Sequence, residues 1–134
     1  LDINRLTDDE LPTVREQVKF MKEYREVLQF GTFYRLLSPF EGNYTAWMVV
    51  SEDKKTAIVG WYKMLNEVNS SFRRVKLRGL APEMEYRVNG KWVHAGDELM
   101  HVGLLTSDSS AGECREGQKP SCDFDSKLFV LQAE

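Results

Sequence analysis

The first quarter of the chain repeats apolar positions with the period of an α-helix. Apolar residues recur at spacings near 3.6 residues, and charged residues occupy the opposite side. Thr7–Glu10 places a hydroxyl at an N-cap position and a carboxylate three residues later, which is typical of a capping box. Because proline fits only the first turn of a helix, we expect a short turn over residues 7–11, a helix from near Pro12 to about residue 29, and its end at Gly31.

The apolar side of this predicted helix is wide enough to need a partner surface. One interpretation is that it packs only on the domain's own sheet. The other is that part of it meets another domain, or a second copy of the chain in a homo-oligomer. The residues that we expect at such an interdomain interface are Val14, Val18, Met21, Val27 and Leu28.

From Gly31 onward the apolar period falls from 3.6 to 2 residues, which is typical of strands. The expected strands cover residues 33–37, 44–51, 57–63, 73–77, 86–88, 91–93, 98–104 and 127–132. Asn89-Gly90 predicts a tight hairpin, because both residues accept a positive φ. Eight short, closely spaced strands predict a mainly β fold, an antiparallel Greek-key β-sandwich preceded by an amphipathic α-helix.

Length and charge restrict the function of this fold. The chain has 134 residues, which is one domain and too few for a (β/α)8 barrel of about 250 residues. No apolar run approaches the ~20 residues of a membrane span, and a net charge of −3 gives no reason to expect nucleic acid or a membrane surface as a partner. No signal sequence follows Leu1, and we expect a cytoplasmic protein. Processing of a precursor would explain the start without Met, but we favour the interpretation that the chain is a piece excised from a longer one.

Few residues suggest metal or catalytic chemistry. Cys114 and Cys122 both fall in a predicted loop over residues 106–125 and could be free thiols or a disulfide. His94 and His101 could belong to a small metal site, although strand-end histidines explain them as well. The adjacent carboxylate pairs fall at a cap and at turns, where Asp and Glu have structural roles. We therefore expect no catalytic residue, no metal and no cofactor.

The tryptophans leave a second function open. Trp47, Trp61 and Trp92, with nearby tyrosines, would form a sugar-stacking platform if several shared one exposed face. Packing in the core is the other use for them. A free-standing carbohydrate-binding module is therefore the alternative to a structural domain.

Several strings of residues, in order along nearly the whole chain, resemble the end of family-36 glycoside hydrolases, the α-galactosidases. They are EQVKFMKEYR (16–25), QFGTFYRLLSP (29–39), AWMVVS (46–51), FRRVKLRGL (72–80), YRV (86–88) and GDELMHVGL (96–104). The family usually has Asn where this chain has His101, and the loop over residues 106–125 is longer than the family leads us to expect.

The resemblance implies a domain division and a role. Residues 1–30 would be the terminal helix of a catalytic (β/α)8 barrel, and residues 31–134 the C-terminal antiparallel β-domain. The parent enzyme would hydrolyse terminal α-D-galactosyl residues from oligosaccharides such as melibiose and raffinose, with catalytic aspartates upstream of this segment. No catalytic or substrate-binding residue is therefore expected here. The chain would cap and stabilise the barrel, its partner in the same polypeptide.

Overall fold

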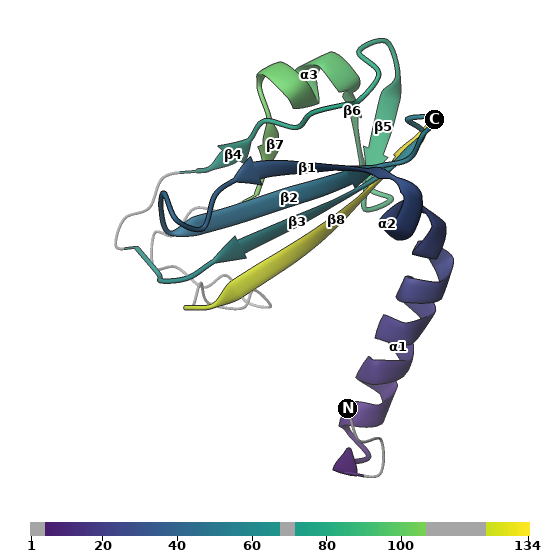
Figure 1. The fold of residues 1–134 in the computed structure, drawn as a ribbon, viewed down its shortest axis with the longest axis vertical. Coiled ribbons are helices and arrows are strands. Elements are labelled where there is room, and N and C mark those ends of the chain that lie inside the picture. Colours follow the sequence, from purple (N-terminus) through teal and green to yellow (C-terminus); the bar gives the residue numbers. More distant parts are fainter. Residues whose placement is uncertain (1–4, 68–71, 107–122) are drawn as a thin grey trace.

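A computed structural model describes residues 5–67, 72–106 and 123–134. The chain begins with two helices, α1 (Glu10–Glu23) and α2 (Arg25–Phe30), and continues into a β-rich body. Helix α1 extends away from that body (Figure 1), whereas α2 lies against the sheet. No side chain of α1 is buried.

One six-stranded antiparallel sheet forms the body. Its strands are β1 (Thr32–Leu37), β2 (Tyr44–Val50), β3 (Thr56–Lys63), β5 (Glu85–Val88), β6 (Trp92–Ala95) and β8 (Asp125–Ala133). They are arranged in the order β1-β2-β3-β8-β5-β6, so the last strand of the chain is inserted between β3 and β5. The predicted mainly antiparallel β fold is confirmed, whereas its Greek-key detail is not.

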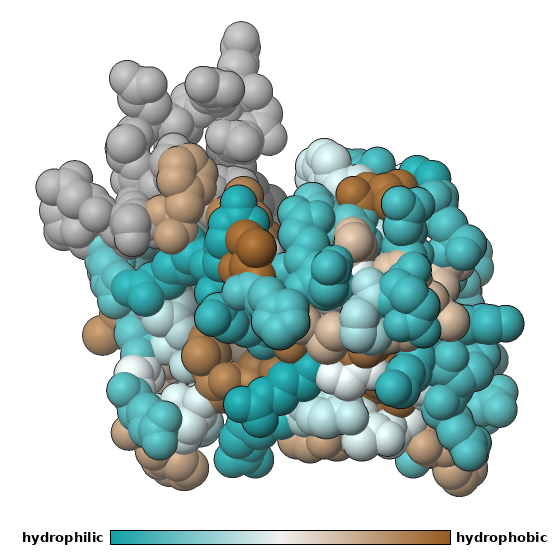
Figure 2. Space-filling view, turned by 90° about the horizontal axis from the view of Figure 1, so that it is seen from above, coloured by the Kyte–Doolittle hydropathy of each residue, from teal (hydrophilic) through white to brown (hydrophobic). Residues whose placement is uncertain are grey.

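A small second layer covers one face of the sheet. It consists of the two-stranded ribbon of β4 (Arg74–Val75) and β7 (Leu104–Leu105) together with helix α3 (Gly96–His101). Figure 1 shows this layer above the sheet, with α1 on the other side. Seen from above, its surface is largely hydrophilic with small apolar islands (Figure 2). The core lies between the two layers and includes Met48, Val59, Trp61, Leu99 and Leu131.

The strand expected over residues 98–104 is wrong, because Gly96–His101 forms α3. Asp97 and Glu98 favour the N-terminal turn of a helix, and Leu99 is the residue that the helix buries. Gly103 ends the helix with φ 101°, and its N–H donates to the Glu98 carbonyl. A seven-residue apolar stretch does not distinguish strand from buried helix by periodicity, and here packing decides.

The first helix begins earlier than predicted and is interrupted. It starts at Glu10, and Tyr24 separates α1 from α2. The Thr7 N–H and Oγ1 both donate to the Glu10 carboxylate, at 2.9 and 3.0 Å, which is half of a capping box. The Thr7 carbonyl accepts from the N–H groups of Glu10 and Leu11, so the turn leads directly into the helix.

Two turn predictions are confirmed. Asn89 and Gly90 have φ values of 48° and 68° and join β5 to β6. Gly31 ends α2 and leads into β1.

Candidate functional site

The two histidines considered for a metal site lie at and near helix α3. The His94 Nδ1 atom lies 3.2 Å from the Glu98 carboxylate, and His101 is in the last turn of α3. Within residues 5–67, 72–106 and 123–134, no three His, Cys, Asp or Glu side chains come close enough to hold a metal ion. Cys114 and Cys122, the candidates for a disulfide, lie outside the described residues.

Two of the adjacent carboxylates, Asp53 and Asp97, bond to nearby groups in a turn and at a helix start. Asp53 accepts hydrogen bonds from Ser51 Oγ and the Lys55 N–H in the turn between β2 and β3, at 2.7 and 3.0 Å. These bonds hold the pKa of Asp53 below its ordinary value. Asp97 accepts from the Glu98 N–H at the start of α3.

The three tryptophans do not share a face. Trp61 is paired with Ala46 across β2 and β3 and lies in the core, whereas Trp47 is paired with Gly60 and lies on the opposite face of the sheet. Trp92 is exposed on the β5–β6 hairpin, where Lys91 Nζ lies 5.7 Å from its ring centroid. A three-tryptophan platform is therefore not formed.

The five residues expected at an interdomain interface are all incompletely covered. Val18 and Met21 on α1 are 47% and 52% exposed. Val14 on α1 and Val27 and Leu28 on α2 are half-buried. The helix side thus remains an apolar surface with room for a partner.

A second apolar surface lies on the sheet face opposite the core, which we call the open face. It is made by Phe33, Trp47, Tyr62 and Leu128, because their strand pairings place them on one side of the sheet. The Phe33 and Trp47 rings stack with centroids 6.3 Å apart. The Trp47 ring lies directly over Gly60, where any Cβ would come within 2.5 Å of it. This surface was not predicted from the sequence. The only feature that could have indicated it is the alternation of residues along the strands, which places these four side chains on one face.

A cavity of about 660 Å³ opens at the end of the sheet where β2 begins and β3 ends. Its polar centre is the Glu67 carboxylate, which accepts from Tyr44 Oη at 3.1 Å, Arg73 Nη2 at 2.7 Å and Asn43 Nδ2 at 3.4 Å. The Arg73 guanidinium also lies over the Tyr44 ring, 4.1 Å from its centroid. We call Asn43, Tyr44, Glu67 and Arg73 the cavity cluster.

Contacts within the cavity cluster determine the protonation states of Glu67 and Tyr44. The hydrogen bond from Arg73 holds the pKa of Glu67 below its ordinary value, so the carboxylate is ionised at neutral pH. Burial, and then the bond to Glu67, raise the pKa of Tyr44, so its hydroxyl keeps its proton. Sequence reasoning missed the cluster because its members come from segments more than 20 residues apart.

Fold and site together define a class of small domain: an antiparallel β body with a projecting amphipathic helix. The model of the glycosyl hydrolase family 36 C-terminal domain matches residues 44–131. The chain belongs to this family.

Curated relatives and solved structures agree with this assignment. The chain is 47% identical over 133 residues to the α-galactosidase AgaA of Geobacillus stearothermophilus, covering 99% of this chain and 17% of that protein. The crystal structure of AgaA in complex with raffinose matches with a TM-score of 0.86 and 40% identity, over 100% of this chain and 17% of that one. The Lactobacillus brevis α-galactosidase structure matches with a TM-score of 0.86 and 40% identity, over 100% of this chain and 18% of that one. The chain thus spans about a sixth of the relatives it matches.

No helix within the described residues has both the length and the apolar character that a bilayer crossing requires.

Proposed function

We propose that this chain is the non-catalytic C-terminal domain of an α-galactosidase-like glycoside hydrolase, and that it caps and stabilises a catalytic barrel in the same polypeptide. The observation that carries the proposal is the match to the C-terminal domain alone, over 17% of relatives that are named α-galactosidases. The parent enzyme would hydrolyse terminal α-D-galactosyl residues from oligosaccharides. Raffinose is one such oligosaccharide, and it is bound in a related structure.

We propose that the upstream domain contacts both apolar surfaces. Residues 1–30 would be the last helix of the barrel, and Val14, Val18, Met21, Val27 and Leu28 would face its neighbours. Two observations support this: no side chain of α1 is buried, and Phe33 and Leu128 on the open face are about half exposed. Aromatic and aliphatic surface of this kind is usual at contacts between domains. A second copy of the chain is the competing partner.

Hydrolysis of a chromogenic α-galactoside tests the catalytic part. We expect turnover by the longer polypeptide that contains this segment, and none by the 134-residue chain. Turnover by the chain itself would overturn the proposal.

Thermal unfolding tests the capping role. A longer polypeptide from which this segment is deleted should lose thermal stability, because the apolar surface that the segment covers becomes exposed. Unchanged stability would contradict the capping role.

Sedimentation of the chain over a range of concentrations distinguishes the two partners. A monomer is expected if the upstream domain is the natural partner, and a stable dimer would favour a homo-oligomer.

A cytoplasmic location is also part of the proposal, and fractionation of the producing cells tests it.

A further inference from the structure

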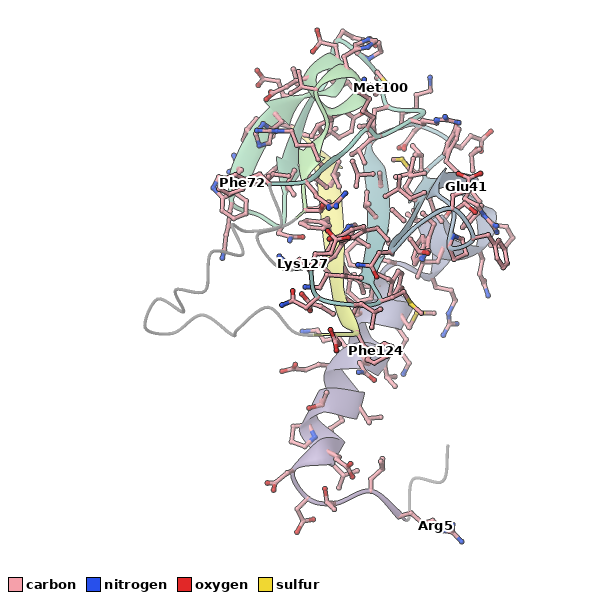
Figure 3. The ribbon with its side chains drawn as sticks, turned by 90° about the vertical axis from the view of Figure 1, so that its left-hand side faces the viewer. Arg5, Glu41, Phe72, Met100, Phe124 and Lys127 are labelled. Atoms are coloured by element: carbon pink, nitrogen blue, oxygen red, sulfur yellow. The ribbon has the colours of Figure 1, made fainter. Side chains whose placement is uncertain are left out.

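We propose that the cavity at the end of the sheet is a binding site for a neutral saccharide. Figure 3 looks onto this end of the molecule, with Phe72 and Glu41 on opposite sides of the view and Lys127 between them. Phe72 and Glu41 both line the cavity. Its volume of about 660 Å³ is in the ordinary range for small-molecule sites.

The polar groups of the cavity are held in place before any ligand binds. Asn43 is fixed by two bonds to the backbone of Leu65: its Nδ2 donates to the carbonyl at 2.6 Å, and its Oδ1 accepts from the N–H at 2.7 Å. Glu67 is held by Tyr44, Arg73 and Asn43. Fixed polar groups lose little conformational entropy on binding, which favours affinity from few contacts.

The charges of the cavity favour a neutral ligand over an ion. The charged side chains among the described lining residues are Glu41, Glu67, Arg73 and Arg74, two acids and two bases. Glu67 and Arg73 pair with each other, and Arg74 Nη1 donates to the Gly103 carbonyl at 3.2 Å. The described lining therefore carries no net charge that would favour a free anion or a free cation.

The hydroxyl groups of a saccharide match the hydrogen-bonding groups of Glu67 and Arg73. The side chains of Glu67 and Arg73 are 37% and 42% exposed, so a carboxylate and a guanidinium lie side by side at the partly open cavity. A hydroxyl both donates and accepts, so vicinal hydroxyls can bond to a carboxylate and a guanidinium at once. The buried Trp61 Nε1–H, beneath the cavity, has no acceptor among the described residues, and such a donor marks a place for a water or hydroxyl.

An aromatic ring at the edge supplies the apolar contact. Phe72 lines the cavity and is 63% exposed, so its ring is free to cover the C–H face of a pyranose. Together, a balanced polar cluster and an exposed ring fit a sugar unit better than a lipid, which needs an apolar cavity, or a phosphate, which needs excess positive charge.

Titration of the ¹⁵N-labelled chain with methyl α-D-galactopyranoside tests the site. We expect saturable shifts of the amide signals of Asn43, Tyr44 and Arg73–Val75, with millimolar affinity. Sodium acetate at the same ionic strength should produce none. Saturable shifts with acetate and not with the galactoside would overturn the proposal, as would galactoside shifts confined to other residues or no shifts at all.

Two variants connect binding to the named residues. Glu67→Gln removes the charged acceptor, and Phe72→Ala removes an exposed ring that is outside the core. Each should weaken galactoside binding about tenfold, whereas the matched control Trp92→Ala, an exposed ring on the β5–β6 hairpin, should leave it unchanged. Equal weakening by all three variants would contradict the proposal. The galactoside titration of the chain tests the cavity, whereas hydrolysis by the longer polypeptide tests the proposed function, so the two can fail independently.

Discussion

At the scale of single residues, Tyr86 of β5 is bonded to two other segments of the chain. Its side chain is fully buried, its hydroxyl donates to the Lys54 carbonyl at 2.7 Å, and it accepts from the Ala81 N–H at 3.0 Å. The turn between β2 and β3 is thereby joined to the segment before β5. A buried polar group of this kind stabilises a fold only while its bonds are complete.

Tyr86→Phe should lower the free energy of unfolding by about 1–3 kcal/mol, because the Ala81 N–H and the Lys54 carbonyl lose their partner. Urea unfolding measures the change. Tyr62→Phe is the control, since Tyr62 is on the open face and 37% exposed, and its effect should stay within about 0.5 kcal/mol. Equal effects of the two substitutions would contradict the role of the hydroxyl.

Burial also raises the pKa of Tyr86 above its ordinary value of 10.0. The folded state therefore holds the proton more tightly than the unfolded state does. The stability linked to it is complete below pH 10 and is lost as the pH rises through the raised pKa. Tyr86→Phe should reduce the loss of stability above pH 10, which unfolding curves at alkaline pH would show.

At the scale of secondary structure elements, the passage from α2 to β1 depends on a close approach. A Cβ on Gly31 would lie 2.5 Å from the Val27 carbonyl oxygen, 2.6 Å from Val49 Cγ1 and 2.7 Å from the Val50 carbonyl oxygen. Two of these atoms are backbone and cannot rotate away. Gly31 is thus required for the packing of α2 on the sheet and not for a left-handed turn, since its φ is −69°.

Gly31→Ala should destabilise the chain by about 1–3 kcal/mol, or more if α2 detaches from the sheet. Thermal unfolding measures it. Gly42→Ala is a matched control, because no atom lies within 4 Å of a Cβ built there. A Gly31→Ala variant as stable as the Gly42→Ala variant would show that α2 does not pack as described.

The start of α1 should respond to acid. Thr7 donates two bonds to Glu10, and the backbone bond, followed by the side-chain bond, holds the pKa of Glu10 below its ordinary value of 4.5. The stabilisation of the helix start is present above pH 4.5 and is lost as the pH falls through the lowered pKa. Amide chemical shifts over the first turn of α1 should therefore lose helical character in acid.

Glu10→Gln should weaken the same turn at neutral pH and remove its response to acid. Glu16→Gln, on the exposed middle of α1, should do neither. Helical shifts that are the same at acid and neutral pH in the unchanged chain would contradict this account of the helix start.

At the scale of the whole molecule, apolar surface is unevenly distributed. The layer that contains α3 presents a largely hydrophilic surface (Figure 2), in which Val102 and Leu105 are exposed, whereas α1 and the open face expose Val18, Met21, Phe33 and Leu128. Such an uneven distribution is typical of a domain that exposes one side to solvent and packs the other side against a partner.

The double substitution Val18→Ser and Met21→Ser should change the stability of the 134-residue chain by no more than about 0.5 kcal/mol, because both side chains are about half exposed. In the longer polypeptide it should cost about 1.5–3 kcal/mol for each apolar side chain that the upstream domain buries. Thermal unfolding of both forms measures this. The control is Lys19→Ser with Glu23→Ser on the charged side of α1, and equal losses in the longer polypeptide for both pairs would contradict an interface at Val18 and Met21.

The period of the apolar residues determined most of the secondary structure. The strands at residues 33–37, 44–51 and 57–63, the hairpin at Asn89-Gly90 and the helix end at Gly31 follow from local preferences, and the structure has them within about a residue. Residues 98–104 were misassigned because such a short apolar stretch fits both periods. Only contact with the core selects helix α3, which buries Leu99.

The family could be determined from the sequence alone, because short strings of residues in order along the chain match its pattern. Recognising them requires no knowledge of tertiary contacts. Tertiary structure alone decided which residues meet. It inserted β8 between β3 and β5, separated Trp47 from Trp61 on opposite faces of the sheet, and assembled the cavity cluster from distant segments. The physical reason is that periodicity and turn preferences act between near neighbours in sequence, whereas strand order and side-chain clusters depend on long-range packing.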